Sequence, residues 1–411
     1  MIDYEHFTLA NGLQVFIHAD PTTPMAAMNV AYRVGSKNED EEKTGFAHLF
    51  EHLMFRGSRH IANYDRPLQT VGGENNAYTS ADLTNYHLSL PAANLETAFW
   101  LESDRMLALD FQEEKLEAEK RVVIEEFKQN YLNQPYGDAW LRLHPLAYKV
   151  HPYRWATIGK DPSHIARATL ADVEDFFFRY YRPNNASLVV AGNLSRVQVE
   201  DLAQKWFGDI PAGASEKQDI PSEPPQTEAR IDEVRADVPM EVLYMAFHMA
   251  GRAETAYYLG DLLSDVLGRE RSSRLYRRLV KDTQLCAAVK AYVSGAADPG
   301  LLVIQAYAHV GQDLLAIEQE IWQVIEDLKQ QPVAENELKK VQNKAESTVL
   351  FNEVELLNRS TRLAYFASLG QPRLINQETH LIQAITPQQL QNTAREILRE
   401  ENVSKLYYRK K

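Results

Sequence analysis

Cysteine is nearly absent from this sequence, since Cys286 is the only one in 411 residues. A single cysteine excludes a disulfide within the chain, and scarce cysteine is compatible with a reducing compartment. Residues 1–18 are polar at first and then alternate as a strand does, unlike the apolar core of a secretory signal. We therefore expect a cytoplasmic protein, with the periplasm as the alternative if a signal has been removed.

Long apolar segments are missing as well. No run approaches the roughly 18 consecutive apolar residues that indicate a membrane-spanning helix, so we expect no membrane span. The chain is nevertheless 45% hydrophobic, and 411 residues are enough for two or three domains with cores of their own.

Basic residues are the minority among the charges. The chain has 44 Lys and Arg against 57 Asp and Glu, which gives a net charge of −13. Nucleic-acid-binding proteins present a basic surface, so this balance argues against a nucleic-acid partner. An acidic cleft could instead attract basic peptides.

The most informative segment that is present is the pentapeptide His48-Leu49-Phe50-Glu51-His52. Two histidines four residues apart project from one face of a helix, so both imidazoles can reach the same metal ion. Glu51 lies three residues after His48 and is placed to take a proton from a water molecule in such a site. The spacing reverses the H-E-x-x-H motif of zinc peptidases. The alternative is two helix-surface histidines with a solvated glutamate between them.

The residues around this motif predict a helix. The apolar ones recur with the helical period and form a stripe for a protein core: Phe46, Leu49, Phe50, Leu53 and Met54. The two histidines and Glu51 lie off that stripe. Gly57 follows as a natural helix stop.

A hydrolytic zinc site usually has three protein ligands and one open position, so a third ligand is needed. Residues 113–128 (EEKLEAEKRVVIEEFK) predict a helix that is dense in carboxylates. Glu119 and Glu126 share a face of that helix within about 20°, so one could bind the metal while the other orients a histidine. The residues alone leave Glu117 and Glu125 open as well. A solvated acidic helix is the plain alternative.

Three further segments add a family pattern to the H-x-x-E-H motif and the acidic helix. Residues 72–80 match G-G-x-x-N-A-x-T-S, residues 151–159 match H-P-Y-x-x-x-x-I-G, and residues 181–192 match Y-x-P-N-N-x-x-L-V-V-x-G. In this order they resemble the pitrilysin and mitochondrial processing peptidase family. The resemblance covers residues 11–195.

This resemblance implies a zinc-dependent metallopeptidase in which His48, His52 and Glu126 bind Zn²⁺. Glu126 takes this place because it matches the last glutamate of the family's E-R-x-x-V-x-x-E pattern. Glu119 then lies beside a ligand histidine and orients it, and Glu51 is the general base. Lys120 stands where arginine is commoner, a change that we expect to be harmless.

The resemblance also implies that the substrate is an unfolded peptide and that the strand around Asn76 and Ala77 binds it. An exposed strand edge can pair with the main chain of an extended peptide and makes little demand on its sequence. Without the resemblance, Asn75-Asn76 would rather predict a turn, because asparagine favours turns.

One departure from the family lies in the second half. Self-sufficient members carry an Arg and, seven residues later, a Tyr that help to hold the substrate and stabilise the tetrahedral intermediate. Val280 and Ala287 stand at those positions here. Arg277 and Arg278 lie two or three residues too early to share the required helix face.

The departure implies a metal-bearing subunit of a heterodimer, in which a homologous subunit supplies the Arg/Tyr pair and closes a chamber around the peptide. Two alternatives stay open. The chain could be a homodimeric peptidase with another oxyanion donor, His87, Tyr257 or Tyr258. It could also be a non-catalytic scaffold, although the intact zinc motif argues against that.

Composition divides the chain once, at the stretch 208–230 that is rich in Pro, Ser and Gly. We expect a zinc-binding catalytic domain at 1–210, a linker at 211–228 and a metal-free second domain at 229–411. The fold class is α+β, with two similar domains that each pack helices on a mostly antiparallel sheet.

The expected elements follow the hydrophobic periods. In the first half we expect strands at 13–18, 26–34, 83–90 and 187–191 and helices at 45–56, 92–108, 113–131, 170–180 and 197–206. In the second half we expect strands at 240–248, 287–294 and 301–308 and helices at 254–267, 272–281, 312–329 and 334–356.

The second half is interpreted as a degenerate copy of the first. A shift of 222 residues aligns two similar charged helices and places Val341 opposite Glu119 and Thr348 opposite Glu126. The copy therefore keeps the scaffold and lacks the carboxylates of the metal site.

Overall fold

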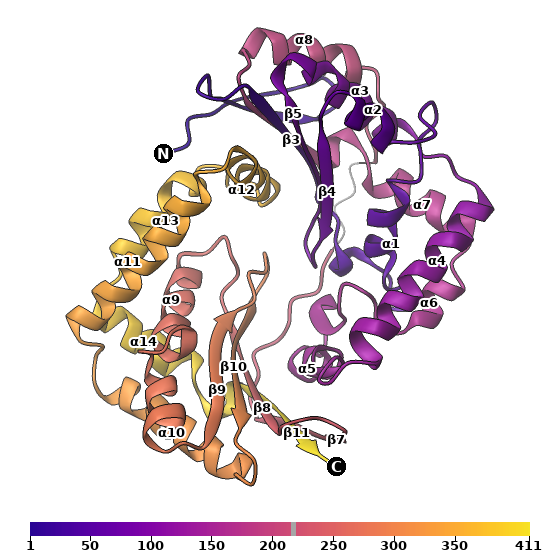
Figure 1. The fold of residues 1–411 in the computed structure, drawn as a ribbon. Coiled ribbons are helices and arrows are strands. Elements are labelled where there is room, and N and C mark those ends of the chain that lie inside the picture. The colour runs from indigo at the N-terminus through magenta and orange to yellow at the C-terminus, as the bar shows by residue number, and fades with distance from the viewer. Residues whose placement is uncertain (215–218) are drawn as a thin grey trace. The chain divides into compact units, whose positions relative to one another are not determined.

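The computed structural model describes residues 1–214 and 219–411, which form two compact units. Each unit contains one sheet with helices packed on it (Figure 1). This confirms the predicted α+β class with two domains of similar plan. The remaining residues of the predicted linker, 215–218, lie outside the described part of the chain.

The two units differ from the predicted sequential domains because each contains a segment from the other half. The first unit consists of Met1–Phe127, Trp155–Ile220 and Phe351–Asn376. The second consists of Lys128–Arg154, Pro221–Leu350 and Gln377–Lys411. The predicted linker at 211–228 thus separates the two halves of the chain in sequence. It does not separate the two units, because Lys128–Arg154 and Phe351–Asn376 each pack on a sheet whose strands come mostly from the other half.

The first unit contains the following elements. Its strands are β1 (Glu5–Thr8), β2 (Gln14–Ala19), β3 (Met25–Tyr32), β4 (Glu74–Thr79), β5 (Thr84–Pro91) and β6 (Ala186–Gly192). Its helices are α1 (Phe46–Leu53), α2 (Asp65–Thr70), α3 (Leu95–Leu107), α4 (Glu113–Phe127), α6 (Pro162–Ala166), α7 (Leu170–Tyr180), α8 (Arg196–Phe207) and α12 (Leu356–Ser368).

The second unit contains a matching set. Its strands are β7 (Arg230–Ala236), β8 (Val242–Met249), β9 (Cys286–Val293), β10 (Gly300–Ala308) and β11 (Val403–Lys410). Its helices are α5 (Ala139–Ala147), α9 (Thr255–Ser264), α10 (Leu314–Gln330) and α14 (Pro387–Ile397). Helices α11 (Glu335–Asn352) and α13 (Leu374–Gln383) each continue a few residues past the division. Three segments wind as π-helix: η3 (Lys128–Leu132), η6 (Asp265–Arg269) and η7 (Tyr276–Asp282).

The first sheet ends in strand β4, which pairs with β5 and with no other strand of the described residues. The strand order is β1-β2-β6-β3-β5-β4. Strands β2 and β6 run parallel, and the other neighbours are antiparallel. In the β4–β5 register Asn76 lies opposite His87 and Ala77 opposite Tyr86. The segment 74–79 is therefore a strand with a free edge, as the family resemblance implied, and not a turn.

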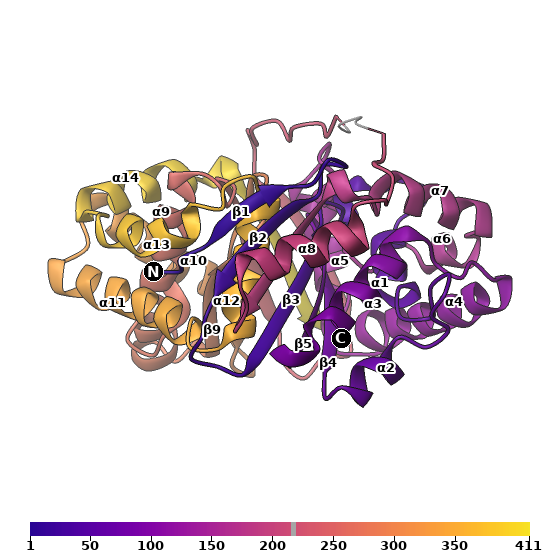
Figure 2. The same ribbon diagram turned by 90° about the horizontal axis from the view of Figure 1, so that it is seen from above.

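Both faces of the first sheet are covered. Helix α12 packs on β3 and β6, where its Leu363 and Phe366 join Phe16 and Val189 in one buried cluster. The Asn29 side chain of β3 donates a hydrogen bond to Ser360 Oγ of α12 at 2.7 Å. Because side chains alternate along a strand, the neighbouring positions of the sheet face the other way, toward α3 and α8 (Figure 2).

The second sheet repeats the plan of the first. Its strand order is β7-β11-β8-β10-β9, again with one parallel pair, β11 with β7. Strands β2-β6-β3-β5-β4 of the first sheet follow the same path. Helices α7 and α14 both begin with a threonine capping box, at Thr169 and Thr386. This correspondence supports the interpretation of the second half as a copy.

None of the helices in residues 1–214 and 219–411 is both long and apolar enough to cross a membrane. The cytoplasmic location stays a prediction.

The packing of α12 generates a stability prediction. Leu363 is 0% exposed in the cluster with Phe16 and Val189, whereas Val354, in the turn before α12, is 73% exposed. We expect Leu363→Ala to lower the free energy of unfolding by about 2–5 kcal/mol, because it leaves a cavity. The control Val354→Ala should change it by less than about 0.5 kcal/mol. Urea unfolding followed by circular dichroism measures both, and equal effects would contradict the packing of α12 in this core.

Candidate metal centre

Helix α1 carries the H-x-x-E-H motif and is buried along its apolar stripe. Phe46, Leu49 and Phe50 are between 0% and 2% exposed, as the helical period predicted. The helix begins after Gly45, whose φ of 89° favours glycine. A Cβ at Gly45 would also lie 2.7 Å from the carbonyl oxygen of Ile158. This glycine therefore lets the chain turn into the helix.

The first turn of α1 is capped by the side chain of Glu39. Its two carboxylate oxygens accept hydrogen bonds from the backbone N–H groups of Gly45 at 2.9 Å and Ala47 at 2.8 Å. Such bonds satisfy donors that have no partner within the helix. Burial raises the pKa of Glu39 to about 8, although these N–H donors act in the opposite direction. A fully buried carboxyl thus fixes the start of the helix.

Helix α4 packs directly on α1 and supplies the carboxylates. Glu119 is 1% exposed, and Glu126, two turns further along the same face, is partly exposed. Helix α4 ends at Phe127, and the chain then winds as the π-helical segment Lys128–Leu132, where we had predicted continuous α-helix.

Three side chains from these helices converge on one point. The potential ligand atoms of His48, His52 and Glu126 all lie within 4.8 Å of one another, and no other group of this kind occurs in the described residues. Glu126 Oε2 is 3.7 Å from His48 Nε2 and 3.6 Å from His52 Nε2. The structure therefore brings together the three residues that we had expected to bind a metal.

Glu119 lies behind His52, on the side away from Glu126. Its Oε2 is 3.3 Å from His52 Nδ1, and its Oε1 is 2.5 Å from Nε of Arg56. Metal-binding histidines commonly have a carboxylate on the second ring nitrogen, which fixes the ring and its tautomer. Burial by itself would raise the pKa of Glu119, but the contacts with His52 and Arg56 outweigh burial and hold that pKa low. Glu119 thus stays anionic beside His52.

The two histidines have different electrostatic environments. Burial, with a smaller contribution from the neighbouring His52, lowers the pKa of His48 to about 4. The bond to Glu119 raises the pKa of His52, although burial acts against it. Since a metal binds the neutral imidazole, His48 is ready to bind at neutral pH and His52 must first compete with a proton.

Glu51 lies next to this cluster without belonging to it. Its Oε2 accepts a hydrogen bond of 2.6 Å from Thr79 Oγ1, at the end of β4. A pocket opens here, and its lining is formed by Glu51, His52, Phe55, Arg56, Asp65 and Glu119. Glu51 thus lies at a pocket beside the three-residue cluster and outside that cluster, as the predicted proton acceptor would.

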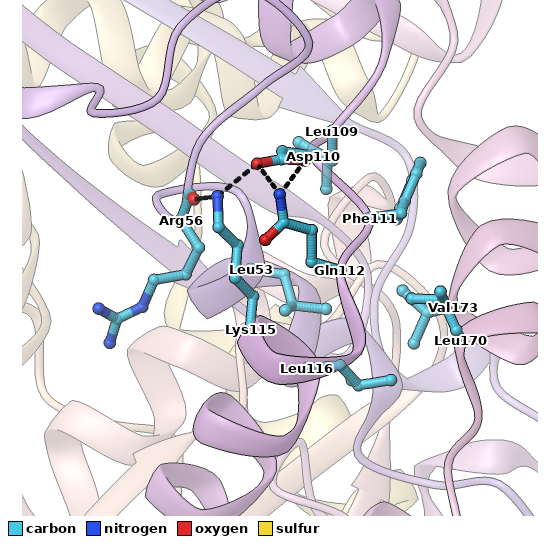
Figure 3. A pocket seen from close by; sticks show the side chains of 10 residues that line it. All are labelled: Leu53, Arg56, Leu109, Asp110, Phe111, Gln112, Lys115, Leu116, Leu170 and Val173. Carbon is cyan, nitrogen blue, oxygen red and sulfur yellow. Dashed lines mark hydrogen bonds and ion pairs between the residues drawn. The ribbon is translucent and has the colours of Figure 1, made fainter.

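A second, mainly apolar pocket lies where α1, α4 and α7 meet (Figure 3). Lys115 of α4 donates to the carbonyl oxygen of Arg56 at 2.7 Å and to Asp110 Oδ2 at 2.6 Å. The guanidinium of Arg56 points out of this pocket, and its Nε contacts Glu119. The chain after α1 is thus attached to α4 through both its backbone and its side chain.

The predicted peptide-binding residues lie on β4. Asn76 is exposed, and the backbone N–H of Ala77 donates to Asn76 Oδ1 at 2.8 Å. The side chain of Asn75 donates to Asp65 Oδ1 of α2 at 2.8 Å. The strand that carries Asn76 and Ala77 contacts α1, so these residues and the ligand cluster belong to neighbouring elements.

Comparison with known proteins identifies the family. Residues 14–159 match the family described as insulinase (peptidase family M16), and residues 167–345 match the peptidase M16 inactive domain. The zinc protease PqqE of Helicobacter pylori is 32% identical over 346 residues, which are 82% of this chain and 77% of that protein. The chain belongs to peptidase family M16.

Other M16 relatives agree over longer stretches. The beta subunit of the mitochondrial-processing peptidase of Caenorhabditis elegans is 26% identical and matches 97% of this chain and 88% of that protein. The crystal structure of a protease from Helicobacter pylori superimposes with a TM-score of 0.93 at 27% identity and covers 100% of both chains. Relatives of this chain are named zinc proteases, and zinc is the metal that M16 membership implies.

Sequence reasoning missed two side chains of this M16 site. Thr79 stands in the G-G-x-x-N-A-x-T-S segment, but its contact with Glu51 spans 28 residues and has no local signal. Arg56 follows His52 by four residues on the sequence, and this spacing could have indicated a side chain near the second imidazole. The roles of His48, His52, Glu126, Glu119 and Glu51 stay predictions, which two experiments address.

The first experiment tests the third ligand. We expect Glu126→Gln to weaken zinc binding by at least about 100-fold, beyond the loss that a residue supporting a ligand causes. The matched control Glu125→Gln changes the neighbouring carboxylate, which is exposed on α4, and should retain zinc. Competition with a chromophoric chelator measures both affinities. Full zinc in Glu126→Gln together with loss in Glu125→Gln would move the assignment by one residue.

The second experiment uses pH. Since the pKa of His52 is raised, zinc must displace a proton below that pKa, and affinity should fall about tenfold per pH unit there. His48, with a pKa of about 4, adds no dependence at higher pH. Glu119→Gln removes the main cause of the upward shift, so the onset of the fall should move to lower pH. The measurement is zinc affinity between about pH 5 and 8 for the wild type and Glu119→Gln. A constant affinity in the wild type, or the same onset of the fall in both proteins, would contradict the prediction.

Proposed function

We propose that this M16 chain is a zinc-dependent endopeptidase that hydrolyses unfolded peptides. The observation that carries the proposal is the convergence of His48, His52 and Glu126, with Glu51 beside them and outside the ligand set. A scaffold protein would need neither three ligands nor a carboxylate held at the edge of the same pocket.

The donor set fits zinc. Two imidazole nitrogens and one carboxylate oxygen form a known catalytic set for this metal, and ligand atoms about 2.1 Å from a tetrahedral zinc lie roughly 3.4 Å apart. Glu126 Oε2 lies 3.7 and 3.6 Å from the two histidine nitrogens. A small adjustment of side chains would satisfy this geometry, and three protein ligands leave one position open.

The residues of the site have separate tasks in this proposal. Bound zinc supplies a Lewis acid that polarises the scissile carbonyl and makes water acidic enough to lose a proton near neutral pH. Glu51 accepts the proton of the attacking water and delivers it to the leaving amine when the C–N bond breaks. Glu119 keeps the His52 ring in the orientation that points Nε2 into the site.

Strand β4 supports the assignment of an extended peptide as substrate. In the part of the chain that the structure describes, it is the edge of its sheet and pairs only with β5, and it carries Asn76 and Ala77 beside α1. A peptide added to this edge would be held by main-chain hydrogen bonds, with little dependence on its sequence. The scissile bond of that peptide would then lie near His48, His52 and Glu126.

We propose further that the chain acts as the metal-bearing subunit of a heterodimer with an enclosed chamber. The positions expected to carry the Arg/Tyr pair are occupied by Val280, in η7, and Ala287, in β9. Their side chains are aliphatic and supply neither a guanidinium nor a phenol. Arg278 is engaged by Glu320, with Nε 2.5 Å from Oε2. Tyr257 and Tyr258 are buried in the second core, which argues against them as substitutes in a homodimer. A homologous subunit with the Arg/Tyr pair would complete the site.

The test is cleavage of an unstructured, internally quenched peptide by the zinc-loaded chain, alone and with a candidate sister subunit. Activity should require both chains and should fall by about 10²–10⁴-fold in Glu51→Gln, which removes the base. Zinc content should be unchanged in that variant, because Glu51 is not a ligand.

Each alternative has its own result. Cleavage by the chain alone that vanishes in Glu51→Gln would establish a self-sufficient enzyme and contradict the argument from Val280 and Ala287. A chain that binds no zinc, or a zinc-loaded pair that cleaves no peptide, would favour the scaffold.

A further inference from the structure

We propose that Thr79 is a positioning residue for Glu51 and couples the peptide-binding strand β4 to the general base. The inference deepens the proposed function and rests on it for the role of Glu51. The family motifs quoted for this sequence assign no role to Thr79. The argument comes from the contacts of Thr79 and from the way β4 is anchored.

The hydrogen bond between the two side chains is short and specific. Thr79 Oγ1 donates to Glu51 Oε2 at 2.6 Å, a length typical of a hydroxyl bound to a carboxylate. Within residues 1–214 and 219–411, neither side chain makes another hydrogen bond. The bond therefore engages Oε2 and leaves Oε1 as the oxygen without a hydrogen bond among the described residues, in a side chain that lines the pocket shared with His52.

This occupancy assigns the proton transfers to one atom. Oε1 takes the proton from water as the new C–O bond forms, and the same Oε1 gives it to the amine nitrogen as the C–N bond breaks. The Thr79 hydroxyl keeps its own proton throughout and continues to donate its hydrogen bond to Oε2. The hydrogen bond at Oε2 opposes rotation of the carboxylate between the two transfers, and such positioning contributes to the rate.

Thr79 stands at the firmly anchored end of β4. The next two residues belong to the hairpin turn, where Ser80 and Ala81 accept hydrogen bonds from the backbone N–H groups of Ser36 at 3.2 Å and Lys37 at 3.0 Å. A Cβ at Gly35 would lie 2.4 Å from the carbonyl oxygen of Ser80, so the two segments are in close contact. The hydroxyl is thus presented to Glu51 from a fixed position.

Strand β4 pairs with β5 along one edge, and its opposite edge is open for a peptide in the part of the chain that the structure describes. Alternation along β4 puts Asn75, Ala77 and Thr79 on one face. On that face Asn75 is bound to Asp65 of α2 and Thr79 to Glu51 of α1. A peptide that pairs with β4 would therefore lie along the strand that already holds Thr79 against Glu51. Binding of substrate and orientation of the base would thereby use one element.

Two substitutions separate this role from a merely structural one. Thr79→Val keeps the shape and β-branching of the side chain and removes the donor, whereas Thr79→Ser keeps the donor and removes a methyl group. Ser89→Ala is the control, since it removes a hydroxyl from the adjacent strand β5 that contacts Glu74 and not Glu51.

The decisive measurement is the conformation of Glu51 in crystal structures of the zinc-loaded wild type, Thr79→Val and Thr79→Ser. We expect one Glu51 rotamer, bonded to residue 79, in the wild type and the serine variant, and more than one rotamer or a displaced one in the valine variant. An unchanged single rotamer in Thr79→Val would overturn the proposal. This readout does not depend on peptide cleavage, so it decides the positioning role even if the proposed function fails.

Kinetics with the internally quenched peptide give the second readout. In the peptide-cleaving form of the protein, Thr79→Val should lower kcat by about 10–100-fold with KM, zinc content and melting temperature unchanged. Thr79→Ser and Ser89→Ala should retain kcat within about threefold, a change of less than 1 kcal/mol. A valine variant with wild-type kcat, or a serine variant as slow as the valine one, would overturn the proposal. A wild type that cleaves nothing would count against the proposed function alone.

Discussion

The whole site depends on the attachment of one short helix. Helix α1 has only eight residues, and an isolated helix of that length is not stable in water. Its position is therefore set by contacts with other elements: Glu39 binds its first turn, Tyr86 of β5 donates to the Phe50 carbonyl, and Lys115 of α4 binds the Arg56 carbonyl just beyond it. These contacts fix the histidines against α4 and Glu51 against β4.

The part of this arrangement that local spacing encodes was predictable. The spacing of His48 and His52, four positions apart, and an apolar stripe indicated α1, and the spacing of Glu119 and Glu126, seven positions apart, indicated a shared face of α4. The choice of Glu126 needed the family pattern, because only the packing of α1 on α4 distinguishes it from Glu125. No periodicity in residues 351–376 could show that they cover a sheet whose strands begin near residue 5, since that contact joins distant parts of the chain.

The two units differ in the charged groups that surround corresponding positions of their helices. On a loose alignment Asp261 and Asp265 of the second unit stand where the first has His48 and His52. Burial and the neighbouring Asp265 raise the pKa of Asp261 to about 6, and Arg269 contacts Asp265 at 2.9 Å. A protein cation thus lies beside the buried carboxylates there, whereas the first unit gathers two imidazoles and a carboxylate in a group that could hold a metal ion. This contrast agrees with the match of the second half to an M16 inactive domain.

The exchange of α5 and α12 between the units also governs the order in which the protein can mature on the ribosome. The first sheet is translated by residue 192, but its face toward α12 stays uncovered until residues 356–368 have been made. Nascent chains normally fold domain by domain from the N-terminus. Here the first unit cannot be completed until most of the second half has been synthesised, and one face of its sheet stays uncovered during that interval.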